Sequence, residues 1–337
     1  MPSTLLALRL ARALGTTVEA LFDAVPPAGF PVLVAPSLPG GGRSAGHGVQ
    51  RAVVATVRGT LVAHWVQGVA TTPADGTLEL GDPIGHSSGF TALFHPFRDD
   101  APGTDRALVA GCAPTLDLLA RRAGGRFGDA KASWITATSG RSLDLLADGL
   151  VHVAGFHRPD PGSGESSASI VAARFPGQRM LLAHLTRWRQ GFVVPEGNPL
   201  GIRSASDLGR AGLRFAQREE GAEAHRLTRR LLEEEGSADL RLSGPVADGH
   251  EDVARLVRYG AADVGVAIES VALAQNLMFI PIVEERFDLV VPHDLADFGP
   301  VRRLLETLDS AAYRAELRCF PGYDVGSSGH VTTVDGA

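Results

Sequence analysis

The sequence is poor in cysteine and has no clusters of metal-ligating side chains. Its 337 residues include 2 cysteines, Cys112 and Cys319. So few cysteines argue against a disulfide framework, and without clustered Cys and His pairs the spacing of a structural zinc site is absent. We therefore expect a reducing compartment and no metal centre.

The sequence also has no strong excess of one charge and no long apolar run. Its 32 basic and 38 acidic residues give a net charge of −6, spread along the chain. No global positive field favours nucleic acid. No run approaches the roughly 18 apolar residues of a membrane helix, and Arg9 and Arg12 interrupt the apolar start, unlike a secretory signal. We expect a cytoplasmic location and no membrane partner.

Motifs of the common catalytic classes are missing. There is no G-x-S-x-G elbow, no GxxxxGK[ST] phosphate loop, and no G-x-G-x-x-G between a strand and a helix. The Gly-rich stretch GGGRSAG precedes a predicted strand and has no lysine, which favours a loop. We therefore expect neither an enzyme nor a bound cofactor.

What the sequence contains falls into three parts. Residues 1–25 predict two helices, one over 3–14 and a shorter one from Thr17 to Phe22. Residues 28–98 predict a small β-rich module with two strands that turn at Arg58-Gly59. From 105 to 330 buried strands alternate with amphipathic helices, a pattern that indicates a parallel α/β sheet.

The third part contains two sets of strands and helices. Strands are predicted at 107–113, 131–139 and 151–157, each followed by helical or turn residues. An extended segment at 180–200 then crosses to a second set that begins near 213. This order predicts two α/β lobes joined by extended crossings.

Seven motifs in this part occur in an order and spacing typical of one family. They include VAGCAPTLDLLARR, SLDLLADGLVHVAGFH, RQGFVVPEGNP, SDLGRAGLRFAQREEGAEAHRLTRRLL and GAADVGVAIESVA, followed by IPIVEERFDLVVP and LDSAAYRAELRCFPGYDVGSSG. Together they resemble the periplasmic-binding-protein-like (type 2, molybdate/tungstate-binding-like) sensor domain of bacterial helix-turn-helix transcriptional regulators. The same domain is also found fused to molybdopterin-biosynthesis proteins.

Residues 1–25 further resemble the last two helices of a Cro/repressor-type helix-turn-helix domain. In that domain the groove-entering helix precedes the helix matched by residues 3–14. We therefore expect DNA to be a partner only if a further N-terminal segment completes the motif. A homodimer is a candidate assembly.

The resemblance implies a two-lobed fold that hinges closed on a small molecule or ion in a cleft. Open α/β sheets bind ligands at the carboxyl ends of strands, where helix N-termini present free N–H groups. Gly191, on the crossing, is the candidate hinge residue. The candidate ligand residues are Cys112, Ala113, Thr115, Ser139, Ser142, His157, Arg189, Gln190, Arg218, Glu219, Gly221, Glu223, His225 and His250.

The turn at 219–225 departs from the family pattern. Relatives have Asn-Arg-Gln, a variable residue and Gly-Ser-Gly-Thr-Arg, where this chain reads Gln-Arg-Glu-Glu-Gly-Ala-Glu-Ala-His from Gln217 to His225. Glu220 and Glu223 are either ordinary helix-start acids or occupants of the anion position, where they would repel molybdate. A third interpretation is an amine or metal ligand held by Glu219, Glu223 and His225, with His250 and Glu251 as further candidates.

Two other residues have alternative interpretations. Cys112 sits between a strand and a helix start, a location typical of reactive thiols, but a small buried apolar role also fits. His250 either lines the cleft or caps its helix. The leading hypothesis is the ligand-sensing module of a one-component regulator. The alternatives are an accessory protein or enzyme of molybdenum-cofactor metabolism, a binder of cationic ligands, or a transporter's solute-binding protein.

Overall fold

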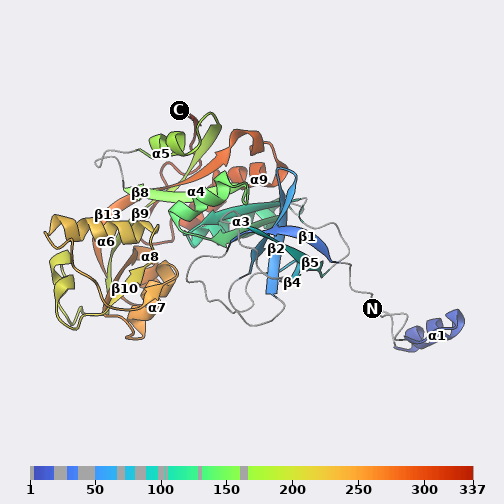
Figure 1. Ribbon diagram of the computed structural model, residues 1–337, viewed down its shortest axis with the longest axis horizontal. Helices are drawn as coiled ribbons and strands as arrows, with labels where there is room; N and C mark the ends of the chain where they lie inside the picture. The colour runs from blue at the N-terminus through green and yellow to red at the C-terminus, as the bar shows by residue number, and fades with distance from the viewer. Residues whose placement is uncertain are drawn as a thin grey trace.

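The computed structural model contains an N-terminal helix, a small β-barrel and a large α/β body (Figure 1). None of the helices it describes is long and apolar enough to cross a bilayer. The described residues are 4–18, 29–36, 50–66, 73–79, 89–97, 103, 105–127, 131–159 and 166–336.

Helix α1 (Thr4–Leu14) confirms the first predicted helix and ends before Gly15, whose positive φ of 65° suits a helix stop. Its five leucines are between 41% and 65% exposed. Figure 1 shows the helix apart from the α/β body. The second predicted helix, from Thr17 to Phe22, lies largely outside the described residues, so the helix-turn-helix remains a prediction.

Strands β1 to β5 form a closed barrel in the order β1-β3-β2-β4-β5. The predicted turn is confirmed: Arg58 and Gly59 have φ of 46° and 83°, the positive values that a two-residue hairpin requires. Val34, Val54 and Phe94 are among the buried side chains of its interior. The strands are β1 (Phe30–Val34), β2 (Gln50–Val57), β3 (Thr60–Trp65), β4 (Gly76–Glu79) and β5 (Phe90–Pro96).

One mixed sheet runs through the body in the order β11-β10-β12-β9-β13-β8-β6-β7, and β14 and β15 also pair with β9. Its outer strands at each end are parallel pairs, and the central β9–β13 pair is antiparallel. The strands are β6 (Arg106–Gly111), β7 (Lys131–Thr136), β8 (Val153–Pro159), β9 (Arg179–Val194), β10 (Phe215–Arg218), β11 (Val246–Ala247), β12 (Val264–Ile268), β13 (Met278–Pro292), β14 (Tyr323–Asp324) and β15 (Val331–Asp335).

Helices cover both faces of this sheet. Figure 1 shows α6, α7 and α8 grouped with β10, and α3, α4 and α9 grouped at the other end of β9 and β13. The helices are α3 (Thr115–Phe127), α4 (Ser139–Ala147), α5 (Ser167–Arg174), α6 (Glu223–Glu234), α7 (His250–Arg258), α8 (Glu269–Ala274), α9 (Gly299–Leu308) and α10 (Ala311–Leu317), with short 3-10 turns η1 (Ala205–Gly209) and η2 (His293–Leu295).

The predicted two-lobed α/β fold is therefore confirmed. Lobe 1 contains β6, β7, β8, α3, α4, α5, α9 and α10, and lobe 2 contains β10, β11, β12, α6, α7 and α8. Strands β9 and β13 belong to both lobes, because β8 pairs with the second half of β13 while β12 pairs with the end of β9. Any residue near the middle of these two strands lies at the joint between the lobes.

The barrel is docked onto lobe 1 through buried histidines. His64 Nε2 lies 2.7 Å from the Leu150 carbonyl oxygen. His152 accepts the Leu108 N–H at Nδ1 (3.0 Å), so its Nε2 carries the proton that is donated to Thr56 O (3.1 Å). Desolvation by burial lowers the pKa of both His64 and His152 to about 4, against opposing backbone hydrogen bonds.

These two histidines should make the protein less stable in acid. The unfolded chain takes up protons below the ordinary histidine pKa of 6.5, while the folded chain resists until about pH 4. Their contribution is therefore fully present above pH 6.5 and is lost as the pH falls from 6.5 to 4. Each full shift corresponds to about 3 kcal/mol.

Urea unfolding measured across this pH range checks the expectation. The His64→Gln variant retains a donor group but cannot titrate, so its free energy of unfolding should change less with pH than that of the parent. His95→Gln, at a half-exposed barrel position, is the matched control for replacing a barrel histidine. Equal slopes in the parent and His64→Gln would contradict the assignment.

Candidate ligand-binding site between the two lobes

The lobes touch where the first turn of α4 faces the turn before α6. A Cβ added to Gly140 would lie 3.6 Å from the Gly221 carbonyl oxygen, and Arg158 Nη1 of lobe 1 lies 3.7 Å from Glu223 Oε2 of lobe 2. A cavity of about 610 Å³ takes its lining from both sides of this contact. Its lining includes Thr138, Ser139, Gly140, Arg141, Phe156, Arg158, Glu219, Glu220, Gly221, Glu223 and Arg226.

Two of the predicted ligand hydroxyls are used within lobe 1. Ser142 Oγ donates to Thr138 O at 2.8 Å, and Ser142 is fully buried. Ser139 Oγ accepts the His157 backbone N–H at 3.3 Å. Thr138 accepts the Arg141 N–H and so caps α4. Ser139 lines the cavity and Ser142 supports the turn that presents it.

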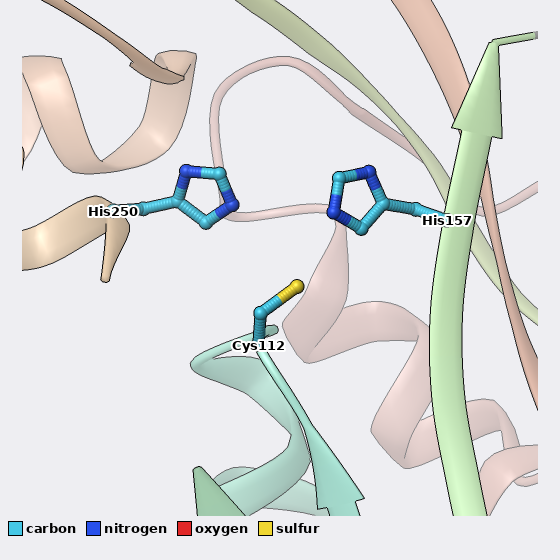
Figure 2. A group of neighbouring side chains, drawn as sticks. All are labelled: Cys112, His157 and His250. Carbon is cyan, nitrogen blue, oxygen red and sulfur yellow. The ribbon is translucent and has the colours of Figure 1, made fainter. Parts of the chain in front are cut away.

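Next to Ser139, three side chains from separate elements converge. Cys112 follows β6, His157 lies in β8 and His250 begins α7, so lobe 1 supplies two of them and lobe 2 the third. Figure 2 shows the Cys112 sulfur and both imidazole rings turned toward one another. The sulfur and one nitrogen of each ring lie within 4.8 Å of one another.

The position of the His157 ring is set by a buried carboxylate. Its Nδ1 lies 2.5 Å from Glu285 Oε2, and both side chains are at most 2% exposed. The same Glu285 oxygen accepts hydrogen bonds from Trp188 Nε1 (3.3 Å) and from the Gln190 amide. His157 Nδ1 therefore donates to the carboxylate, and Nε2 is the nitrogen left for another partner.

The two histidines have opposite electrostatic environments. Burial alone lowers the pKa of His157, but the neighbouring Cys112 sulfur and Glu285 carboxylate outweigh it and hold this pKa well above its ordinary value. Desolvation lowers the pKa of His250 well below its ordinary value, with Arg218 and His157 adding to the effect. His250 is thus a neutral imidazole at neutral pH.

His250 is oriented by aromatic packing. It is 2% exposed, and neither ring nitrogen has a hydrogen-bond partner among the described residues. Its ring centroid lies 5.8 Å from that of Trp188 and 6.1 Å from that of His157. The capping interpretation is wrong, because Gly249 is the cap residue of α7 and no side chain makes a cap hydrogen bond.

The acidic turn before α6 neutralises its own arginine. Arg218 is 6% exposed, and its Nε and Nη2 each lie 3.1 Å from an oxygen of Glu219, so the guanidinium fork is occupied. Glu223 is also buried and pairs with Arg226 at 3.1 Å. Glu220 is exposed. Glu219 and Glu223 are therefore partners of local cations, while Glu220 matches an ordinary helix-start acid.

Arg189 and Gln190 are consecutive residues of β9, so their side chains point to opposite faces of the sheet. Gln190 is fully buried beside His157, whereas Arg189 is exposed and pairs with Glu269 at 2.6 Å. Arg189 thus points away from the cluster. Gly191 lies inside β9 against the Ile280 backbone, where a Cβ would collide. Its role as a hinge stays a prediction.

The remaining predicted residues lie around the cluster or behind it. Ala113 and Thr115 are buried at the start of α3, next to Cys112. His225 lines a separate cavity of about 570 Å³ within lobe 2, and its Nδ1 lies 3.1 Å from Arg218 O. The structure therefore brings Cys112, His157, Gln190 and His250 together but places His225 elsewhere.

Glu285 and Trp188 are site residues that sequence reasoning missed or assigned to packing. The signal for Glu285 was available: it shares the alternating face of β13 with Phe287, Leu289 and Val291, which are fully buried. A carboxylate in such a row requires a buried partner. Its partner, His157, lies on β8, and only the strand pairing reveals that they meet.

Comparison with known proteins identifies the family of this chain. Residues 120–309 match the model of the PBP superfamily domain. The chain belongs to the PBP superfamily. It is 26% identical over 235 residues to the uncharacterized protein YvgK of Bacillus subtilis (strain 168), covering 68% of this chain and 74% of YvgK.

Two solved structures overlap with much of this chain at low sequence identity. The regulatory domain of MetR, a LysR family regulator from N. meningitidis, is 9% identical with a TM-score of 0.45, covering 65% of this chain and 97% of that one. The sulfate-binding protein SubI of Mycobacterium tuberculosis H37Rv is 14% identical with a TM-score of 0.44, covering 62% and 83%.

Removing the Glu219 charge should free Arg218 for an anion. We expect Glu219→Gln to bind tungstate or molybdate roughly 10-fold more tightly than the parent, because a charge-assisted hydrogen bond to an arginine is worth roughly 1.5–3 kcal/mol. Titration calorimetry at low salt measures this. Glu220→Gln, in the exposed part of the turn, is the matched control with a smaller expected effect. Equal affinities for both variants would contradict the role given to Glu219.

Proposed function

We propose that this PBP-superfamily protein is a ligand-sensing module that binds a small solute or ion between its two lobes. The observation that supports it is the buried polar cluster of Cys112, His157 and His250, to which both lobes contribute. Buried polar atoms without partners are costly to a fold and are kept where a ligand uses them. The proposed role is binding without catalysis.

Sensing works through the joint between the lobes. Strands β9 and β13 carry register shifts between Pro281 and Val283 and between Phe287 and Asp288, and such irregularities let paired strands bend. A ligand that contacts His157 on one lobe and His250 on the other has more contacts in the closed arrangement. It therefore shifts the population toward closure by its difference in affinity for the two states.

The ligand differs from the oxyanion that the sequence resemblance implies. The final arginine of the resembled motif is His225 in this chain, and Arg218, which matches the pattern, already has a carboxylate partner in Glu219. The exposed Glu220 carboxylate also repels an incoming anion by an amount of order 1–4 kcal/mol at close range near a surface. These contacts favour a neutral or cationic ligand over molybdate.

The regulatory output is a further part of the proposal. Helix α1 presents exposed leucines and lies apart from the body (Figure 1). In a one-component regulator this helix belongs to a helix-turn-helix domain, and closure of the lobes changes DNA affinity. DNA binding by the protein, with and without ligand, is measured by fluorescence anisotropy on promoter fragments upstream of its own coding sequence.

A larger side chain at Gly140 tests whether ligand binding requires closure of the two lobes. Leucine at this position extends from the first turn of α4 toward Gly221 and should hold the lobes apart, whereas an alanine Cβ makes ordinary contact at 3.6 Å. We expect Gly140→Leu to weaken ligand binding by roughly 10-fold or more, because it lowers the fraction of closed protein. Gly140→Ala is the matched control and should bind like the parent.

The measurement is a thermal-shift screen with oxyanions, amines, amino acids and metal ions. A ligand at 100 times its dissociation constant stabilises the folded state by about 2.7 kcal/mol. Small-angle scattering then reports whether the bound protein is more compact. Ligand binding that is unchanged in Gly140→Leu, with no compaction, would overturn the closing mechanism.

A further inference from the structure

The cluster of Cys112, His157 and His250 has the composition of a metal site. We propose that these three side chains bind one transition-metal ion of the class that takes thiolate and imidazole ligands, zinc(II) or copper(I). The inference rests on the proposed function, because it names the ligand class of the same interlobe site. It departs from the sequence-based expectation that the protein has no metal centre.

The ligand set and spacing fit this class of ion. Zinc bonds to cysteine sulfur at about 2.3 Å and to histidine nitrogen at about 2.0–2.1 Å, which sets neighbouring ligand atoms roughly 3.3–3.6 Å apart in a tetrahedron. The three atoms here lie within 4.8 Å of one another. Cys112 and His157 belong to lobe 1 and His250 to lobe 2, so a small further closure brings them into bonding range.

The surroundings of His157 match those of a metal-bound histidine. Ligating histidines almost always donate their second ring N–H to a carboxylate or carbonyl, which fixes the ring and raises its basicity. His157 Nδ1 makes this bond to Glu285 at 2.5 Å, and Trp188 and Gln190 hold the same carboxylate oxygen. The nitrogen that faces the cluster is therefore Nε2.

A second, independent observation comes from His250. Its two ring nitrogens are buried and have no hydrogen-bond partner within the described ranges. Together with Gln190 Oε1 and Glu285 Oε1 they make up four of the seven unpartnered buried side-chain atoms in the described part of the chain. These four atoms lie on residues at or touching one cluster, as a site shaped around an additional group requires.

A cation at the cluster would also lie beside a buried carboxylate. Glu285 is fully buried, and the ion pair recorded for it in the described part of the chain is with His157. The Arg218 guanidinium, in the turn before α6, is paired with Glu219. A metal ion bound to the Cys112 thiolate adds positive charge beside a carboxylate that has no lysine or arginine partner among these residues.

The alternative use of these residues is thiol chemistry. Cys112, His157 and Glu285 stand in the order nucleophile, base and orienting group. That arrangement gives no role to His250, which buries two ring nitrogens in the same space. Metal binding uses all of these side chains, so the geometry favours it.

Cobalt(II) and copper(I) test the proposal on the full chain. Protein is stripped with chelator under reducing conditions and titrated with cobalt(II), which mimics zinc and gives a thiolate-to-cobalt charge-transfer band. We expect about one equivalent per chain, displaceable by zinc(II). A parallel titration against a copper(I)-specific chelator distinguishes the two metals. Metal content of the intact protein is measured by mass spectrometry.

Substitutions test which side chains bind the metal. Cys112→Ser should abolish the charge-transfer band, and His250→Gln should lower the affinity at least 100-fold. Glu285→Gln should lower it about 10- to 100-fold, as expected for a positioning residue behind a ligating histidine. The matched controls are Cys319→Ser and His330→Gln, at exposed positions away from the cluster, which should bind like the parent. Melting temperatures without metal show whether each variant folds.

The outcomes separate this inference from the proposed function. Failure of the parent to bind cobalt, zinc or copper(I), or binding that persists in both Cys112→Ser and His250→Gln, overturns the metal site. Alkylation of Cys112 that zinc does not slow also counts against it. If an amine or another solute instead binds and Gly140→Leu blocks it, the proposed function stands without the metal. If neither metals nor solutes bind, both the metal site and the proposed function are overturned.

Discussion

The antiparallel pairing of β9 and β13 is the constraint on which the rest of the structure depends. Both strands are long enough to belong to two lobes, and their registered pairs run from Met180 with Pro292 to Val194 with Met278. Because β8 pairs with β13 and β12 with β9, the pairing brings His157, Trp188, Gln190 and Glu285 to the joint. A shift by one residue would exchange the two faces and move Glu285 away from His157.

Buried polar groups are distributed unevenly over the protein. Where the barrel meets lobe 1, His64 and His152 each hydrogen-bond to a backbone carbonyl oxygen. These bonds join the two parts within a shared apolar core. At the joint, His250 and one oxygen each of Gln190 and Glu285 have no partner among the described residues. The first arrangement is complete by itself, whereas the second has unpartnered atoms that the proposed ligand would contact. This difference is the basis for proposing that ligand binding occurs at the joint.

The acidic turn shows how a sequence departure becomes a change in chemistry. In the pattern that the sequence resembles, the turn offers hydroxyls, a flexible backbone and an arginine to an oxyanion, and His225 stands at that arginine's position in this chain. Here Glu219 occupies the Arg218 fork, Glu223 pairs with Arg226, and the carboxylates neutralise the turn that would hold an oxyanion. The same lobe now reaches the ligand region with His250. In the proposed metal site, selectivity would therefore depend on coordination by nitrogen and sulfur and not on charge attraction.

The sequence by itself determined the two-lobed fold, because alternating buried strands and amphipathic helices allow few other arrangements. It also put Cys112, His157 and His250 among the candidate ligand residues, since strand ends and helix starts meet at one edge of an α/β sheet. It did not show that they meet one another, that Glu285 orients His157, or that Arg189 points outward while Gln190 points inward. Only the tertiary structure decided these, because each depends on the pairing of strands far apart in the chain, and local periodicity carries no information about which strands pair or in what register.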